Sequence, residues 1–223
     1  MLKVDNITKA YHKKPIITNL SFTVQPGEII GLVGENGAGK STLLQMLATL
    51  QPPTVGNICL YDWTYKKNRK QVRRHIGFVP QDIAIWENFT VRENMLFFEK
   101  LSWKKKSEKQ LEQLCLDMNL DRWNDKVQTL SGGMKRKLNL AISLIHDPDL
   151  LLLDEPTVGI DLKSKKEISF YLQKLAIDNQ KMIVYTSHDM DEIKGLCTRV
   201  LCIGKDPFYK DLLQQAGKEI ASF

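Results

Sequence analysis

The residues that best indicate chemistry form a glycine-rich segment at 34–42, Gly-Glu-Asn-Gly-Ala-Gly-Lys-Ser-Thr. It fits the phosphate-binding pattern G-x-x-x-x-G-K-[ST], with Gly34, Gly39, Lys40 and Ser41 at the fixed positions. In such a loop the backbone N–H groups surround phosphates, and the dipole of the following helix adds positive potential. We expect Lys40 to reach the β- and γ-phosphates of a nucleotide and the Ser41 hydroxyl to hold Mg²⁺.

The segments on either side of this loop have the character that a phosphate site requires. Residues 28–33 are a short apolar run that predicts a buried strand, and residues 41–47 open a helical pattern. Gly34, Gly37 and Gly39 allow backbone angles and a close approach that a Cβ would prevent. A chance glycine-rich turn would not need this strand–loop–helix context, so the context favours a nucleotide site.

Two adjacent acids form the second strong signal. Four leucines at 150–153 are followed by Asp154, Glu155 and Pro156. A buried strand that ends in two carboxylates delivers them to the carboxyl edge of a sheet, where open α/β sheets bind ligands. Asp154 could then hold Mg²⁺, and Glu155 could take a proton from an attacking water. The alternative is that both acids merely cap a strand, but the nearby phosphate loop favours catalysis.

Three further residues are weaker candidates. Gln81 follows a predicted strand at 75–80 and suits a water or a γ-phosphate oxygen, although most loop glutamines are only solvated. His188 follows a predicted strand at 182–187 and could hydrogen-bond a γ-phosphate, or be structural. Tyr11 could stack on a nucleobase or simply pack on the first strands.

A second anion-binding helix start is predicted at Ser131-Gly132-Gly133. Its simpler interpretation is an N-cap, since serine is favoured there. One nucleotide needs only one phosphate cradle, however. A spare cradle therefore indicates that two chains share each nucleotide.

The remaining elements predict the fold class. Strands that alternate with helices indicate an α/β protein with a central, mostly parallel sheet. Lys40 and Asp154 lie farther apart than a minimal phosphate-loop fold requires, so we expect a helical insert at roughly 82–147. The other predicted elements are antiparallel strands within 1–30, strands at 57–61 and 149–154, a helical stretch from Thr90 to about Asn119, helices from Ser131 and Ser164, and a final helix near 211–213.

Composition is that of an ordinary globular protein: 223 residues, 43% hydrophobic and 26% charged. No apolar run approaches the ~18 residues of a membrane-spanning helix, and the start lacks a signal-peptide core. We therefore expect a cytoplasmic chain. The four cysteines lack C-x-x-C spacing, which predicts reduced, buried thiols: Cys59, Cys115, Cys197 and Cys202.

The net charge is +6 and the basic residues are clustered, for example at 66–74, 104–106, 135–137 and 163–166. Solvated faces are the default interpretation of such clusters. Attraction to an anionic membrane or to nucleic acid are the two functional alternatives, and charge alone does not separate them.

With these motifs in order, residues 2–205 resemble the nucleotide-binding domain of an ABC transporter. The family's Walker A motif matches residues 34–42, and its Walker B motif with the catalytic glutamate matches residues 150–155. The remaining motifs match the adenine-stacking aromatic Tyr11, the Q-loop at Gln81, the signature at 130–133, the D-loop at 159–161 and the switch histidine His188. Met134 departs from the pattern, because the family commonly has Gln there.

The resemblance implies a RecA-like phosphate-loop core with a small antiparallel β-subdomain and an inserted helical subdomain, spanning 1–205 with a short tail at 206–223. Two copies would sandwich two ATP molecules head to tail. Ser131 and Gly133 of one copy would bind the γ-phosphate held by the other copy's Lys40. Asp161 would cross the interface, and Gln81 would lie near a membrane subunit. Dimer closure on ATP would drive that subunit.

The implied cofactors are ATP and Mg²⁺, with no covalent cofactor and no nucleic-acid partner. The expected partners are a polytopic permease subunit at the cytoplasmic face of the membrane and a second nucleotide-binding domain. Segments 86–94 and 157–161 resemble single-domain exporter ATPases, so export is expected. The alternatives are a soluble ABC-type ATPase that acts on nucleic acid or the ribosome, and a regulatory module that binds ATP without turnover.

The predicted site residues fall into three groups. For catalysis they are Glu155, His188, Gln81 and Lys40. For the nucleotide they are Tyr11, Gly34, Glu35, Asn36, Gly37, Ala38, Gly39, Lys40, Ser41, Thr42, Ser131, Gly132, Gly133 and Asp161, and for the metal they are Ser41, Gln81 and Asp154.

Overall fold

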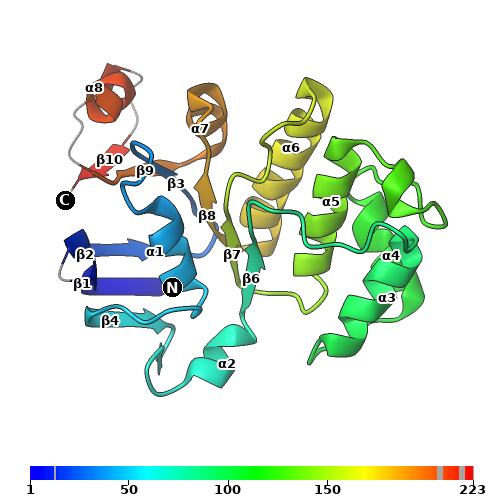
Figure 1. Ribbon diagram of the computed structural model, residues 1–223, viewed down its shortest axis with the longest axis horizontal. Helices are drawn as coiled ribbons and strands as arrows, with labels where there is room; N and C mark the ends of the chain where they lie inside the picture. The colour runs from blue at the N-terminus through cyan, green and yellow to red at the C-terminus, as the bar shows by residue number, and fades with distance from the viewer. Residues whose placement is uncertain (13, 205–207, 216–218, 223) are drawn as a thin grey trace.

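Two β-sheets with helices around them make up the fold (Figure 1). The computed structural model describes residues 1–12, 14–204, 208–215 and 219–222. The smaller sheet is antiparallel, with the order β2-β1-β4-β5. Its strands are β1 (Leu2–Tyr11), β2 (Lys14–Val24), β4 (Val55–Leu60) and β5 (Trp63–Thr64). This confirms the antiparallel strands expected within residues 1–30.

The larger sheet is parallel and has the order β10-β9-β3-β8-β7-β6. All its strands run in one direction, so their carboxyl ends meet at one edge. This confirms the parallel sheet and the strands expected around residues 28–33, 75–80, 149–154 and 182–187. Its strands are β3 (Ile29–Val33), β6 (Ile76–Val79), β7 (Leu150–Leu153), β8 (Met182–Thr186), β9 (Arg199–Cys202) and β10 (Glu219–Ser222).

The four leucines of β7 show how the core is divided. Leu150 and Leu152 belong to a cluster that packs the antiparallel sheet and helix α1 against one face of the parallel sheet. Leu151 and Leu153 belong to a larger cluster formed with the helices on the other face. In Figure 1, α3 and α4 lie at the end of the molecule farthest from the antiparallel sheet. The helices are α1 (Lys40–Leu47), α2 (Arg69–Arg73), α3 (Val91–Leu101), α4 (Glu108–Leu116), the 3₁₀ turn η1 (Val127–Thr129), α5 (Gly132–Ser143), α6 (Leu162–Asn179), α7 (Met190–Leu196) and α8 (Phe208–Gln215). None of these helices is long and apolar enough to cross a membrane, within the described residues.

Two helix predictions were wrong in detail. The stretch from Thr90 to Asn119 is two helices, because Thr90 and Ser107 each form a capping box that starts a new helix. The helix expected from Ser164 begins at Leu162, because the Asp161 side chain accepts the backbone N–H of Ser164 and caps it. The helix starting after Ser131 and the final helix around residues 211–213 are confirmed. Strand β10, after residue 205, was not predicted.

Candidate functional site

The phosphate loop lies between β3 and α1, as predicted. The Lys40 ammonium donates hydrogen bonds to the carbonyl oxygens of Gly34, at 2.7 Å, and Glu35, at 3.1 Å. Lys40 is buried. Burial lowers its pKa, while the carboxylates of Glu155, Asp154 and Glu35 act in the opposite direction. A cation is thus held at the centre of the loop with a negative cluster facing it.

Two glycines in this loop are required by space and by backbone angle. Gly34 has φ 153°, and a Cβ there would lie 2.0 Å from the carbonyl oxygen of Ile203. Gly39 has φ 108° and precedes the first turn of α1, which contains no acidic residue. The N–H groups at the start of α1 are therefore not used by a side-chain cap, and they suit an anion.

Three predicted catalytic residues meet at the carboxyl edge of the parallel sheet. The Glu155 carboxylate accepts a hydrogen bond from Nε2 of Gln81 at 3.2 Å through one oxygen. Its other oxygen lies 2.7 Å from Nε2 of His188. Gln81, Glu155 and His188 follow β6, β7 and β8 respectively, which are neighbours in the sheet. The sheet order therefore brings together residues that are far apart in the sequence.

The two acids after β7 are fixed by a threonine on the next strand. Thr186 Oγ1 accepts the backbone N–H of Glu155 at 2.8 Å and donates to the Asp154 carboxylate at 2.9 Å. Glu155 itself has φ 48°, in the left-handed region. Asp154 is buried, whereas the Glu155 and His188 side chains are 14% and 47% exposed. Asp154 is thus a fixed ligand candidate, and Glu155 remains open to the cleft.

These residues line one cleft of about 380 Å³. We call it the nucleotide cleft. Every residue that lines it was predicted from the sequence. They are Asn36, Gly37, Gly39, Lys40, Ser41, Thr42, Gln81, Glu155 and His188.

Other predicted residues do not line this cleft. Gly34, Glu35 and Ala38 form the body of the loop, and Asp154 lies behind it. Tyr11 is 42% exposed at the end of β1. Its hydroxyl donates to Gln51, and the Lys9 ammonium lies 5.1 Å from its ring centroid. Its predicted role in stacking remains a prediction.

A separate region contains the predicted second anion site. We call residues 130–133, together with Asp161 and Ser164, the signature surface. Ser131 is exposed and accepts the backbone N–H of Met134 at 3.3 Å, so it is the N-cap of α5. Gly133 is buried, and a Cβ there would lie 2.2 Å from Ser164 Oγ. The start of α5 is therefore packed tightly on the start of α6.

Asp161 stabilises the start of α6 in this packed region. Its carboxylate accepts the backbone N–H of Ser164 at 2.9 Å and the Ser164 hydroxyl at 2.7 Å. These hydrogen bonds from Ser164 lower the pKa of Asp161. The residue thus has a role within its own chain that the sequence reading missed, while its predicted role across an interface remains a prediction. Within the described residues, no residue of the signature surface lines the nucleotide cleft.

The basic run at 135–137 is not a solvated face, contrary to the default interpretation. Arg136 is buried, and its Nη1 donates to the carbonyl oxygen of Gln81. Burial lowers the pKa of the Arg136 guanidinium, against the opposing pull of the Asp82 and Glu155 carboxylates. The neighbouring lysine ammoniums, Lys135 and Lys137, pair with Glu87 and Glu167. Helix α5, which begins at the signature surface, is thereby hydrogen-bonded to the loop after β6 that contains Gln81, here called the Gln81 loop.

The sequence did not reveal the role of Glu192, a half-buried glutamate of α7. The Glu192 carboxylate accepts hydrogen bonds from the hydroxyls of Thr157, at 2.7 Å, Tyr185, at 2.9 Å, and Ser187, at 2.8 Å. The Lys165 ammonium lies 3.0 Å from its other oxygen. Burial would raise the pKa of Glu192, but the hydrogen bonds, led by that of Thr157, outweigh it and lower the pKa. This network joins the segments that follow Glu155 and precede His188.

Comparison with known proteins agrees with this geometry. The family model described as ABC transporter matches residues 17–158. The chain belongs to the ABC transporter family. It is 41% identical over 206 residues to the linearmycin resistance ATP-binding protein LnrL of Bacillus subtilis (strain 168), covering 90% of this chain and 65% of that protein. It is also 41% identical over 207 residues to the Nod factor export ATP-binding protein I of Rhizobium meliloti (strain 1021), covering 91% of this chain and 61% of that protein.

Solved structures of ABC transporter ATP-binding proteins share the fold. An ATP-binding subunit of an ABC transporter superposes with a TM-score of 0.82 at 21% identity, covering 98% of this chain and 95% of that one. A dimeric, post-hydrolysis ATP-binding cassette bound to ADP and Pi superposes with a TM-score of 0.79 at 27% identity, covering 91% and 94%. The RecA-like phosphate-loop fold expected from the ABC transporter resemblance is therefore confirmed.

Proposed function

We propose that this chain binds and hydrolyses ATP as the ATP-binding subunit of an ABC transporter, in a head-to-tail dimer that drives export through a separate membrane subunit. The observation that carries the proposal is the convergence of Gln81 and His188 on the Glu155 carboxylate, in the same cleft as Lys40. A regulatory module without turnover would not need a positioned base.

The residues of the cleft divide the chemistry among them. The N–H groups at the start of α1 and the Lys40 ammonium bind the phosphates. Glu155 accepts a proton from a water whose oxygen attacks the γ-phosphorus, as the bond to the bridging oxygen of ADP breaks. Gln81 and His188 hold the Glu155 carboxylate in place. Glu155, the base, follows β7, and it is therefore oriented by residues that follow β6 and β8, the strands on either side of β7.

Mg²⁺ fits the donors in the cleft, Ser41 and Gln81, together with Asp154, which is buried next to Glu155. Ser41 contributes a hydroxyl oxygen, Gln81 an amide oxygen and Asp154 a carboxylate, and hard oxygen donors are what Mg²⁺ prefers. When bound, the ion would neutralise charge on the phosphate oxygens. Asp154 is held for this role by its hydrogen bond from Thr186.

The proposal of a dimer rests on predicted nucleotide-binding residues that are missing from the cleft of a single copy. Ser131, Gly132, Gly133 and Asp161 lie on the signature surface, outside the nucleotide cleft of their own chain. The Ser131 oxygen caps α5, and its O–H, which donates to no other group among the described residues, can donate to a ligand. A second copy, placed head to tail, brings this surface to the γ-phosphate, with Asp161 at the interface and Tyr11 stacked on the base. The similar cassette bound to ADP and Pi is dimeric.

An exposed aromatic cluster supports docking to a membrane subunit. The ring of Trp86 contacts those of Phe89 and Phe97. The three residues are 53%, 41% and 38% exposed, in the order Trp86, Phe89, Phe97. Trp86 and Phe89 precede α3 and Phe97 lies on it. Exposed apolar patches of this kind mark interaction sites. Docking there would hold the chain at the cytoplasmic face of the membrane.

The names of the similar proteins, which concern resistance and export, favour transport over a nucleic-acid role. The basic clusters do not oppose this, since several of their charges are already paired. Lys104 pairs with Asp147, Lys135 with Glu87 and Lys165 with Asp189. These lysines are partly neutralised within the chain.

Glu155→Gln tests the proposal, because it keeps the shape of the side chain and removes the base. We expect ATP hydrolysis to fall by roughly 10²–10⁴-fold, while ATP binding persists and ATP traps a dimer that size-exclusion chromatography detects. The assay uses the chain together with its membrane subunit, and Glu112→Gln, at a half-buried glutamate of α4 that does not line the nucleotide cleft, is the control. Hydrolysis by Glu155→Gln at the normal rate would contradict the assignment of the base.

A further inference from the structure

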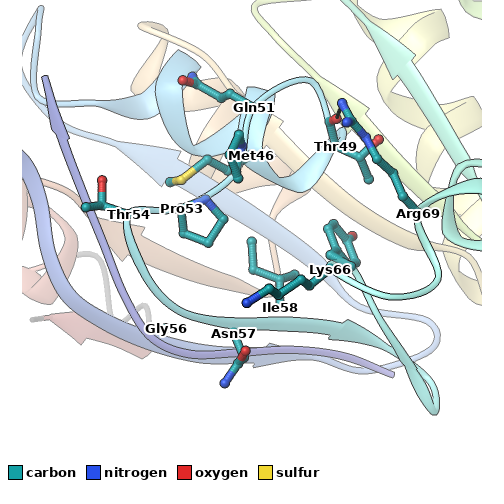
Figure 2. Close-up of a pocket in the computed structure, with 12 residues that line it drawn as sticks. Met46, Thr49, Gln51, Pro53, Thr54, Gly56, Asn57, Ile58, Lys66 and Arg69 are labelled. Carbon is teal, nitrogen blue, oxygen red and sulfur yellow. Dashed lines mark hydrogen bonds between the residues drawn. The ribbon is translucent and has the colours of Figure 1, made fainter.

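A second cavity, of about 360 Å³, lies between the end of α1 and the antiparallel sheet. We call it the α1–β4 pocket. Figure 2 shows Met46 and Thr49 on one side of it and Gly56 and Ile58 on the opposite side. Its volume falls within the range of small-molecule sites, ~300–1,000 Å³. None of the predicted nucleotide residues lines it.

The pocket has an apolar interior with one unused polar group. Met46 and Ile58 are almost fully buried and line it. Tyr65 also lines it and is 8% exposed, yet its hydroxyl has no hydrogen-bond partner among the described residues. Burial raises the pKa of Tyr65, so the hydroxyl stays a neutral donor. A buried donor without a partner costs about 1–3 kcal/mol, which favours an occupant that accepts its hydrogen bond.

The charge on the rim of the pocket is positive. Lys66 and Arg69 line it, and no acidic side chain does so among the described residues. Arg69 is fixed, because its Nη2 donates to the carbonyl oxygen of Thr49 at 2.6 Å. Arg73 donates to the same carbonyl oxygen and adds a further positive charge beside it. A carboxylate, sulfonate or phosphate group would meet cations here without competing acids.

We propose that the α1–β4 pocket binds a small organic anion. Its apolar body lies against Met46 and Ile58, a hydrogen-bond acceptor meets the Tyr65 hydroxyl, and the anionic group lies at Lys66 and Arg69. This site is separate from the nucleotide cleft and does not depend on ATP hydrolysis. Binding there is therefore measured without any assumption about catalysis.

The test uses 1-naphthalenesulfonate as the probe, with neutral naphthalene-1-sulfonamide for comparison. The full chain carries [methyl-¹³C]methionine, and the Met46 signal is assigned from Met46→Leu. We expect a saturable shift of the Met46 methyl signal at millimolar sulfonate, with the buried Met95 of α3 as a distant reference. The sulfonamide is expected to bind at least roughly tenfold more weakly, as the loss of a charge-assisted contact predicts.

Two matched variants decide whether the site is this pocket. Lys66→Glu reverses the charge of a residue that lines it, whereas Lys67→Glu changes an exposed neighbour that does not. We expect roughly tenfold weaker sulfonate binding in Lys66→Glu and about twofold or less in Lys67→Glu, through screened long-range charge. Tyr65→Phe removes the hydroxyl but keeps the ring, and this variant should also bind the sulfonate more weakly. No Met46 shift, equal binding of the neutral probe, or equal loss in both lysine variants would overturn the proposal and leave a pocket that holds only water.

Discussion

The nucleotide cleft and the signature surface use their polar side chains differently. In the cleft, Lys40, Glu155 and His188 come from segments that follow three different strands, and their side chains line open space. Glu155 also contacts His188 across two strand ends. On the signature surface, Ser131 and Asp161 are already the N-caps of α5 and α6. The cleft thus keeps its polar side chains open to a ligand. The signature surface is built to be rigid, and it offers a fixed helix start to something that approaches from outside.

The first test of this contrast removes the link between the two regions, which is the hydrogen bond from Arg136 on α5 to the carbonyl of Gln81. In Arg136→Met the carbonyl of Gln81 loses its charged donor, the buried Arg136 guanidinium, so we expect a loss of about 1.5–3 kcal/mol in the free energy of unfolding. The control is Lys135→Met, whose partner Glu87 is 61% exposed and whose ion pair should contribute less than about 1 kcal/mol. Urea denaturation of both variants measures the difference, and equal losses would contradict the role of Arg136.

A loss of stability of similar or smaller size is expected when a substitution disturbs the packing of the signature surface. In Gly133→Ala the new Cβ would lie 2.6 Å from the Cβ of Ser164, so we expect overpacking to cost about 1–3 kcal/mol. In Gly132→Ala the nearest atom lies 3.8 Å away, and the change should be neutral or stabilising, because alanine is the better helix former. Thermal unfolding of the pair is the measurement. A Gly132→Ala variant that loses as much stability as Gly133→Ala would show that the contact with Ser164 is not what matters.

The smallest expected effect is on the pH dependence of stability. Because the pKa of Glu192 is lowered in the folded protein, its ionised carboxylate contributes stability above its ordinary pKa of 4.5, and this is lost as the pH falls through the lowered value. Glu192→Gln should cost about 1 kcal/mol near neutral pH and flatten the stability curve below pH 4.5. Denaturation between acid and neutral pH tests this, and an unchanged acid limb in the variant would be evidence against the network.

The two regions also differ in how well the sequence predicts them. The residues that line the cleft were all named from the sequence, because phosphate binding needs particular residue types at fixed spacing and strand ends in a parallel sheet meet at one edge. Their roles toward a nucleotide remain predictions. The N-cap role of Ser131 was anticipated, but the cap at Asp161 and the contacts of Arg136 and Gly133 were not predicted. Burial of Arg136 and Gly133 depends on how α5 packs on α6 and on the loop that contains Gln81. Lys135, Arg136 and Lys137 have the composition of a solvated face, and only the tertiary contacts of Arg136 and Lys137 make those two residues part of the interior.

The fold shows the same limit. Long apolar or strongly patterned segments, such as β7 and α5, were predicted correctly. The break between α3 and α4 was missed, although the capping residue Ser107 and Gln110 three positions later mark it. Strands β9 and β10 are short, and their place in the sheet is set by pairing with β3 and with each other rather than by a local pattern.

The central claim, that one copy's cleft is completed by the partner's signature surface, is tested most directly by mixing two inactive variants. Lys40→Met disables the cleft, and Ser131→Arg blocks the signature surface. A mixed dimer has one site with both defects and one site with neither. The account predicts that each variant alone is inactive and that an equal mixture, assembled with the membrane subunit, recovers up to about a quarter of the wild-type ATP hydrolysis, the share that random pairing in a two-fold dimer allows. If the mixture stays as inactive as its components, the signature surface does not act across the dimer and the account is wrong.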